Sequence, residues 1–441
     1  MIKKALRRTG GTTVAQTIQS RLLAALPSLR ALGRWLALAG LTGLACGGAG
    51  AAFTWTVGQA AALRGAHPWL LFCMPLAGLV IVWSYRWAGM ENDSGTNQII
   101  ASVRGGERPP VRLAPLIFLG SALTHLTGGS AGREGAALQI GGSISAGLGR
   151  LLRVNEKNTN TIIQCGMAGL FSALFGTPLT ATVFALEVVN VGQFRYAALF
   201  PCLLSALTAN AVPRALGLPG EAYHLRGLPE LGPASLLQCG GLAVLAALVS
   251  IAFCVLMHSA GRLYQRYLPN QYLRILAGAA AVILLTLIEG SGDYNGAGGH
   301  VIELAVEGEV RVPWAFLLKM LFTALTLGSG FRGGEIVPTL FIGSTFGCAA
   351  APLLGLDPAF AAAVGMIALF CGVVNCPLAS IFLSIELFGG EGLLFFALAC
   401  SLSFLLSGRY SLYSSQNIVY SKLEARLNEN VQKEEPICSD R

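Results

Sequence analysis

A glutamate and an arginine lie inside a glycine-rich stretch of an almost uncharged part of the chain. Residues 128–135 read Gly-Gly-Ser-Ala-Gly-Arg-Glu-Gly. A charged side chain at membrane depth costs roughly 3 kcal/mol or more, so a carboxylate there suggests a function. The surrounding glycines let the backbone approach a small ligand closely. We interpret Glu134 as a gate for an anion, placed at the start of a helix whose dipole stabilises its charge.

The same carboxylate could carry protons. A protonated Glu134 loses its attraction to the helix N-terminus and can swing out of an anion site, which would couple anion movement to proton movement. One alternative is structural, with Glu134 and Arg133 forming a buried or interfacial ion pair. A second alternative assigns the gate to Glu335, which we expect instead to cap its own helix or to face water.

A second segment that could bind an anion is residues 93–98, Asp-Ser-Gly-Thr-Asn-Gln. Asp93 and Ser94 are good N-cap residues, so a helix is expected to start there. Its first N–H groups have no partner within the helix and could bind an anion next to Ser94 and Gly95. A plain capped helix after a loop is the alternative.

A third segment precedes Ile336 and Val337, whose N–H groups would point into the site. Pro338 fits the first turn of a helix, where its missing N–H does no harm. Tyr413 follows the last long apolar stretch, and its hydroxyl could return to the site, although a lone tyrosine at a membrane boundary is more often an interfacial anchor. Backbone and hydroxyl donors compensate a buried anion, which is otherwise very costly to desolvate. The glycines expected to form the turns are Gly132, Gly135, Gly333 and Gly334.

The composition indicates a membrane protein. Apolar residues make up 54% of the 441, charged residues 12%, and 55 are glycine; the mean hydropathy is +0.63. Several apolar stretches approach the ~20 residues that span a bilayer, whereas others are short and broken by Gly or Pro, as in transporters whose helices stop near the midplane. We predict an all-α, polytopic transmembrane protein of tilted and interrupted helices. The stretches are Trp35–Val57, Leu70–Trp83, Ala197–Val212, Leu236–Met257, Ile275–Ile288 and Leu393–Leu406.

The charges predict the orientation. Basic residues and no acidic residue occur up to Arg34, which places the N-terminus in the cytoplasm by the positive-inside rule. No signal peptide is evident. The net charge of +8 is therefore a topology signal, and we expect no nucleic-acid partner. The 11 cysteines include no Cys-x-x-Cys pair, so neither a metal site nor disulfides are expected, and no cofactor is predicted.

The chain contains an internal duplication. Residues 166–171, Gly-Met-Ala-Gly-Leu-Phe, are echoed by 365–370, Gly-Met-Ile-Ala-Leu-Phe, and Glu187 by Glu386. Glu134 and Glu335 match at nearly the same offset. Such repeats usually build a binding site from interrupted helices at their interface. We predict a cytoplasmic basic segment at 1–30, a transmembrane domain at 31–420 with repeat halves of about 31–215 and 235–410, and a short polar cytoplasmic tail at 421–441.

These motifs together resemble the CLC family of chloride channels and anion/proton antiporters, over about residues 35–420. The resemblance implies the CLC fold with two inverted halves, a homodimer with one pore per subunit, and Glu134 as external gate and proton acceptor. The dimer face would involve helices around Pro178–Ala211 and Pro377–Leu405. The segments that carry the resemblance are 132–135, 334–338, 93–97, 174–179, 193–196 and Tyr413.

Departures from the family pattern bear on the transported ion. Chloride/proton exchangers of the family carry an inner glutamate where this chain has Val188, and Asp93, Thr96, Asn97 and Ile336 also differ from the usual signatures. The segments 97–100, 331–336 and 413–416 look closest to the fluoride/proton antiporter branch, which, however, usually replaces the serine that is kept here as Ser94. Chloride and fluoride therefore both stay open.

The function we predict is transport of a halide, chloride or fluoride, across the cell (inner) membrane, coupled to protons. Both termini would be cytoplasmic, and membrane lipid would surround a homodimer. A passive chloride channel is the alternative. An intramembrane serine hydrolase is a remote one, because residues 128–132 fit a Gly-x-Ser-x-Gly pattern around Ser130, but nothing in the sequence orients a histidine toward it. We therefore do not expect an enzyme.

Overall fold

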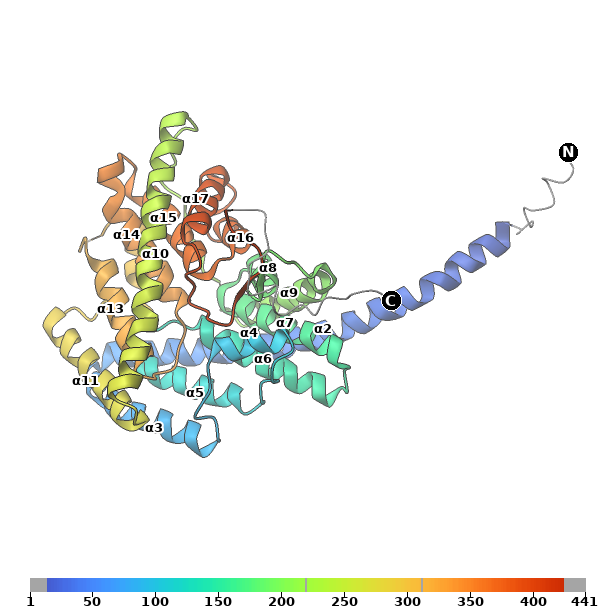
Figure 1. Ribbon diagram of the computed structural model, residues 1–441, viewed down its shortest axis with the longest axis horizontal. Coiled ribbons are helices and arrows are strands. Elements are labelled where there is room, and N and C mark those ends of the chain that lie inside the picture. The colour runs from blue at the N-terminus through green and yellow to red at the C-terminus, as the bar shows by residue number, and fades with distance from the viewer. Residues whose placement is uncertain (1–13, 219, 311, 424–441) are drawn as a thin grey trace, which may run out of the picture.

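The computed structural model describes residues 14–423 except 219 and 311, and almost all of its regular structure is helical (Figure 1). The first elements are α2 (Val14–Ala66), η1 (Pro68–Cys73), α3 (Met74–Trp87), α4 (Thr96–Val103), α5 (Leu113–Leu126), α6 (Glu134–Leu151), α7 (Glu156–Phe175), α8 (Pro178–Glu187), β1 (Asn190–Val191), η2 (Tyr196–Ala198) and α9 (Leu199–Ala215). The later ones are α10 (Pro233–Tyr267), α11 (Gln271–Glu289), α12 (Gly299–Val306), α13 (Ala315–Gly328), α14 (Ile336–Leu354), α15 (Pro358–Val374), α16 (Pro377–Phe388), α17 (Leu393–Leu406) and β2 (Asn417–Ile418).

The protein combines long and short apolar helices, as the sequence predicts. Within the described residues, six helical stretches are long and apolar enough to cross a membrane, whereas α5, α13, α15, α16 and α17 are apolar but shorter. The short helices begin or end inside the protein, where neighbouring segments satisfy their backbone groups. The six long stretches are Arg30–Ala66, Pro68–Trp87, Tyr196–Ala215, Pro233–Tyr267, Gln271–Glu289 and Ile336–Leu354.

The N-terminal boundary expected at residue 30 is not marked by a break. One helix, α2, runs without interruption from Val14 to Ala66, and Figure 1 shows its first part extending away from the other helices. At 1.5 Å per residue, its 53 residues measure about 80 Å, far more than a bilayer core is thick. The first 13 residues of the predicted basic segment, and 424–441 of the predicted tail, lie outside the described residues.

The two halves repeat the same turn. Gly176, whose φ is +76°, caps the end of α7, and Pro178 begins α8; Asn375, whose φ is +54°, caps the end of α15, and Pro377 begins α16. A left-handed residue stops each first helix, and proline at N1 starts the second without losing a needed hydrogen bond. The duplicated sequence therefore encodes a duplicated break between helices.

Two glutamates join the halves reciprocally. Both carboxylate oxygens of Glu187, at the end of α8, accept N–H groups of α16, from Leu378 at 3.2 Å and Ala379 at 2.9 Å. Glu386, on α16, accepts the corresponding N–H groups of α8, from Leu179 at 2.9 Å and Thr180 at 2.8 Å. Each helix thus caps the free N-terminus of its repeat mate with a negative charge, which suits the helix dipole.

Glycines allow the helices within each half to touch. A Cβ added to Gly141 on α6 would lie 2.1 Å from the Gly166 carbonyl oxygen on α7, and one added to Gly343 on α14 would lie 2.6 Å from that of Gly365 on α15. Small residues that bring backbones together are the usual solution in membranes, where the lipid supplies no hydrophobic force between helices.

We expect Gly141→Ala to destabilise the protein by about 1–3 kcal/mol, because the added methyl meets backbone that cannot rotate away. Gly40→Ala is the matched control, since a Cβ there meets nothing within 4 Å. Thermal unfolding in detergent compares the two, and equal midpoints would contradict the close crossing.

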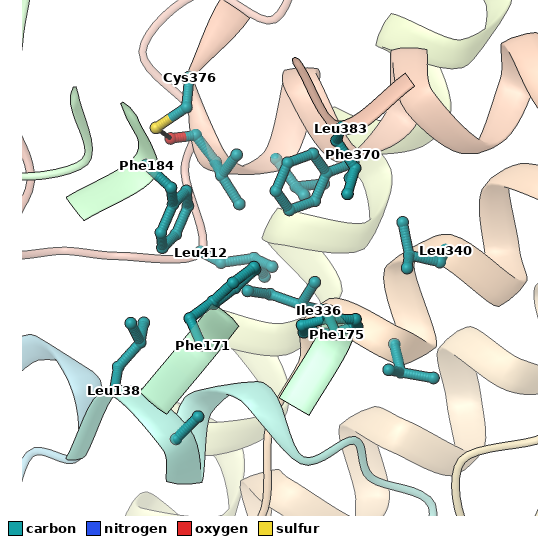
Figure 2. Packing of buried hydrophobic residues seen from close by; sticks show 14 of the residues in the cluster. Leu138, Phe171, Phe175, Phe184, Ile336, Leu340, Phe370, Cys376, Leu383 and Leu412 are labelled. Atoms are coloured by element: carbon teal, nitrogen blue, oxygen red, sulfur yellow. Dashed lines mark hydrogen bonds between the residues drawn. The ribbon is translucent and has the colours of Figure 1, made fainter. Parts of the chain in front are cut away.

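Aromatic side chains from both halves meet in the centre of the protein. Figure 2 shows Phe171, Phe175, Phe184 and Phe370 gathered near Ile336, and the ring centroids of Phe184 and Phe370 are 6.2 Å apart. All five side chains are buried. This apolar packing excludes water from the neighbourhood of the α14 N-terminus, so polar groups there interact in a medium of low dielectric constant.

Candidate functional site

The two glycine-rich turns are paired by their backbones. Gly132 N–H donates to the Gly334 carbonyl at 2.6 Å, and Gly334 N–H donates to the Gly132 carbonyl at 2.8 Å, as an isolated antiparallel bridge. A Cβ on Gly334 would lie 2.5 Å from the Gly135 nitrogen, so only glycine lets the turns approach this closely. The bridge holds the N-termini of α6 and α14 together.

Glu134 lies at this junction and is fully buried. Its Oε2 accepts the N–H of Val337, in the first turn of α14, at 3.1 Å. Its Oε1 has no hydrogen-bond partner among the residues that the structure describes. The carboxylate therefore occupies a helix N-terminus of the opposite half, in the position that an anion would take there.

The start of α4 completes the junction, one or two residues later than the N-cap candidates Asp93 and Ser94 suggest. The helix begins at Thr96 with Gly95 as N-cap, because Asp93 is used otherwise: its side chain accepts the Gly95 N–H at 3.1 Å and forms a 3.0 Å ion pair with Arg332. Thr96 Oγ1 donates to the Gly135 carbonyl at 3.4 Å. The loop before α4 is thus joined to α6 and to the loop before α14.

Ser94 is exposed rather than buried at this junction. It lines a hollow of about 530 Å³, together with Asp93, Arg274 and Arg332. We call this the Arg332 hollow. Ser94 therefore lies at an approach to the three helix starts, on the side where the guanidinium of Arg332 stacks 3.9 Å from the Tyr85 ring centroid.

The loop that carries Tyr413 returns to the same place. Leu412 N–H donates to the Val373 carbonyl, and Ser415 N–H donates to Asn97 Oδ1, both at 2.9 Å. The parallel pair of β1 and β2 holds the end of the loop against the residues after α8. Tyr413 is 1% exposed, which excludes the interfacial-anchor interpretation, and its hydroxyl has no hydrogen-bond partner within the described chain.

A second hollow, of about 320 Å³, is lined by Arg64, His125 and Arg133. We call it the Arg64 hollow. The first turn of α11 lines the Arg332 hollow, whereas Gly292, three residues past its last residue, lines the Arg64 hollow. The 19 residues of α11 measure about 28 Å, close to the thickness of a bilayer core. The hollows therefore open toward opposite ends of the protein, with the paired glycine turns between them.

The structure also tests two structural interpretations, a Glu134–Arg133 ion pair and a capping role for Glu335. Arg133 pairs with Glu221 at 2.8 Å rather than with Glu134, so the expected alternative of a Glu134–Arg133 ion pair is wrong. Glu335 is the N-cap residue of α14, but its side chain forms no capping hydrogen bond; it is partly buried, with Oε2 3.0 Å from a Cβ placed on Gly135.

The described residues place no general base next to Ser130 for the alternative of a serine hydrolase. Ser130 Oγ is hydrogen-bonded to Thr323 Oγ1 at 3.0 Å, and no histidine of the described segment is bonded to it. Within the same residues, no group of three or more His, Cys, Asp and Glu side chains could hold a metal.

Val188 is fully buried directly after Glu187. Both oxygens of Glu187 are bound to α16, as described above, so this carboxylate is committed to holding the halves together. The sequence did not predict that role, nor the contacts of Asn97 and Arg332 with partners more than 200 residues away. No local pattern could have revealed them.

A family model described as "Voltage gated chloride channel" matches residues 77–408. The chain belongs to this family, the CLC family. A "Chloride/fluoride channel protein" of Pseudomonas syringae pv. tomato is 34% identical over 407 residues, which are 91% of this chain and 90% of that protein. An "H(+)/Cl(-) exchange transporter ClcA" of Vibrio vulnificus is 30% identical over 63% of this chain and 62% of its own.

Solved CLC structures share the fold. The "Crystal structure of a CLC-type fluoride/proton antiporter" superposes with a TM-score of 0.85 and 35% identity, covering 88% of this chain and 98% of that one. A slow cyanobacterial Cl⁻/H⁺ antiporter has a TM-score of 0.73 at 22% identity, covering 85% of this chain and 94% of its own, a likeness of fold alone. The predicted fold class and family are confirmed.

Proposed function

We propose that this protein exchanges a halide for protons across the membrane, with fluoride preferred to chloride, and that Glu134 is the gate and proton acceptor. The observation that carries the proposal is the buried Glu134 carboxylate on the α14 N-terminus, between two hollows at opposite ends of the protein. A halide can take the place of the carboxylate there, because backbone N–H groups bind either anion. A protonated Glu134 can then leave the site with its proton.

The preference for fluoride rests on the comparisons. Two relatives match about nine-tenths of the chain at 34–35% identity; one is named as a fluoride/proton antiporter and the other for both chloride and fluoride, whereas the chloride exchanger matches less of the chain. The chain also has Val188 where chloride/proton exchangers of the family carry an inner glutamate, which argues against the chloride exchangers. The three helix starts at Thr96, Glu134 and Ile336, with the Tyr413 hydroxyl, would compensate the ion without a full positive charge that would trap it.

Reconstituted vesicles test the proposal. With a fluoride or chloride gradient and pH recorded, we expect a halide gradient to drive protons uphill, faster with fluoride. Halide flux without proton movement would favour the passive channel, and uphill proton movement with chloride only would reverse the preference.

The Tyr413 hydroxyl is expected to bind the ion. Tyr413→Phe should slow halide efflux about tenfold or more, the usual worth of a hydrogen bond to a charged group. Stability should not fall, because the hydroxyl has no partner to lose in the described chain. Tyr410→Phe is the matched control from the same loop, since Tyr410 is 48% exposed. Efflux rates and melting in detergent check both, and unchanged efflux in Tyr413→Phe would contradict this role.

We also propose that the protein is no enzyme, and that it is a homodimer in the cell (inner) membrane with both termini in the cytoplasm. Helices α8 and α16 pack side by side, and leucines exposed on α8, α9, α16 and α17 form a candidate dimer face within the lipid. A leucine-to-tryptophan pair there should convert dimers to monomers in detergent; unchanged dimers would move the interface elsewhere. The exposed leucines are Leu179, Leu207, Leu378 and Leu394.

A further inference from the structure

The Arg64 hollow carries polar groups that the exchange mechanism does not use. It is formed by the end of α2, the end of α5 and residues 292–301, and Arg133 reaches it from the turn that holds Glu134. Of the side chains that line it, Arg64, His125 and Arg133 all carry N–H groups able to bind an anion. Arg133 is already paired with Glu221, so the unexplained groups are Arg64 and His125.

The tautomer of His125 follows from its one hydrogen bond. The ring is 2% exposed, and Nδ1 lies 2.8 Å from the Ser121 carbonyl oxygen. A carbonyl only accepts, so Nδ1 carries a hydrogen. Nε2 has no partner among the described residues. In the neutral ring Nε2 has only a lone pair to offer, whereas in the imidazolium it becomes a donor. Protonation of His125 therefore creates an anion ligand in the hollow.

Arg64 also has a side-chain nitrogen without a hydrogen-bond partner. Its Nε is buried without a hydrogen-bond partner, and the guanidinium forms no ion pair in the described part of the chain. Its Nη2 lies 3.7 Å from a Cβ placed on Gly296, at the hollow's wall. Arg64 as a whole is partly buried, and a guanidinium that is partly removed from water without a carboxylate is stabilised by another anion.

The remaining charges around His125 are mostly positive. Lys319 is fully buried, and its Nζ donates to the carbonyl oxygens of Tyr294 at 3.1 Å and Gly296 at 2.8 Å, which are uncharged. Burial and the charges of Arg64, Arg133 and Lys319 all oppose protonation of the His125 ring, so an anion beside the ring is needed to stabilise the imidazolium. The other titratable side chains that line the hollow are Asp293 and His300.

We propose that the Arg64 hollow binds one halide ion between the Arg64 guanidinium and the Nε2–H of protonated His125, as a waiting site beside the Glu134 gate. Proton and halide bind it cooperatively, because each charge attracts the other. The site raises the local halide concentration at low pH on that side of the membrane. This inference rests on the proposed halide transport for its role, but the site itself can be tested without transport.

Bromide, which scatters X-rays anomalously, tests the binding. Crystals of the full chain soaked in bromide at low pH should show a peak in the hollow, and Arg64→Gln crystals should lose it. No peak in the unmodified protein would overturn the proposal, even if vesicles transport halide. A peak without halide transport would leave the site standing and refute the proposed function instead.

Flux measured in a Glu134→Gln background tests the role, because the coupled proton is then removed. The halide concentration for half-maximal efflux from the hollow's side should be about tenfold lower at pH 4.5 than at pH 6.5, because burial and the neighbouring cations move protonation of His125 to acid pH. Adding His125→Gln keeps an uncharged amide donor and should remove this pH dependence. His300→Gln, the matched control at an exposed position of the same hollow, should keep it.

Each outcome of these experiments supports or refutes the proposed halide site in the Arg64 hollow. If pH dependence persists in His125→Gln, the histidine is not the ligand. If bromide binds but Arg64→Gln and His125→Gln leave half-maximal concentrations unchanged, the ion is adventitious and the waiting site is refuted. If Arg64→Gln fails to fold, the His125→Gln comparison still separates these results.

Discussion

Replacing Glu134 with glutamine is expected to abolish proton movement while halide still crosses the membrane. The amide cannot take up a proton at physiological pH, so the gate can no longer carry one. Glutamine keeps the size of the side chain and an oxygen that can accept the Val337 N–H, now 3.1 Å from Oε2. The neutral group is held less strongly at a helix N-terminus than a carboxylate, by about 0.3–1 kcal/mol, which eases its displacement by an ion.

The measurement is a vesicle experiment in which a fluoride gradient is imposed and the pH is followed. Uphill proton movement should fall to the background of protein-free vesicles, a complete loss rather than a partial one. Glu303→Gln is the matched control, because Glu303 is exposed on α12 and should leave coupling intact. Unaltered coupling in Glu134→Gln would remove Glu134 from the proton path, and Glu335, which lies beside the same glycine turns, would be the next carboxylate to test.

Glu187→Ala is expected to produce the largest loss of stability among the residues that join the halves. It leaves two N–H groups at the start of α16 without their acceptor, one buried at Ala379 and one partly buried at Leu378, and Glu187 itself is only 4% exposed. Hydrogen bonds to a charged group are worth about 1.5–3 kcal/mol each, so a loss of about 3 kcal/mol or more is expected. The melting temperature in detergent should fall accordingly.

The symmetry of the repeat provides the comparison for this variant. Glu386→Ala removes the two corresponding bonds at the start of α8, one of which lies at an exposed position. Water can replace the lost acceptor there, so the fall in melting temperature should be smaller. Equal effects of the two substitutions, or none from Glu187→Ala, would show that the reciprocal caps do not hold the halves together.

Local chemistry in the sequence was enough to identify the parts of this protein. Apolar length predicted membrane helices, and Gly-Thr-Pro and Asn-Cys-Pro at 176–178 and 375–377 mark the breaks between them, because left-handed residues and proline act within one turn of the chain. The repeat matched Glu134 with Glu335, and so predicted that the helix starting at Ile336 corresponds in the second half to the helix starting at Glu134 in the first. A buried charge is so costly that Glu134 stood out without any structural information.

Tertiary structure alone decided which groups meet. Arg133 forms its ion pair with Glu221, and Asp93 forms its ion pair with Arg332, 239 residues away. Each arginine could in principle pair with any of several carboxylates, and nothing in the local sequence says which one. Ser94 is exposed, and α4 starts at Thr96, because the Asp93 carboxylate turns back on Gly95 and across to Arg332. Hydrogen bonds and ion pairs act over about 3–4 Å, so their partners are fixed by how the two halves pack, whereas helix breaks and apolar spans are fixed by neighbours along the chain.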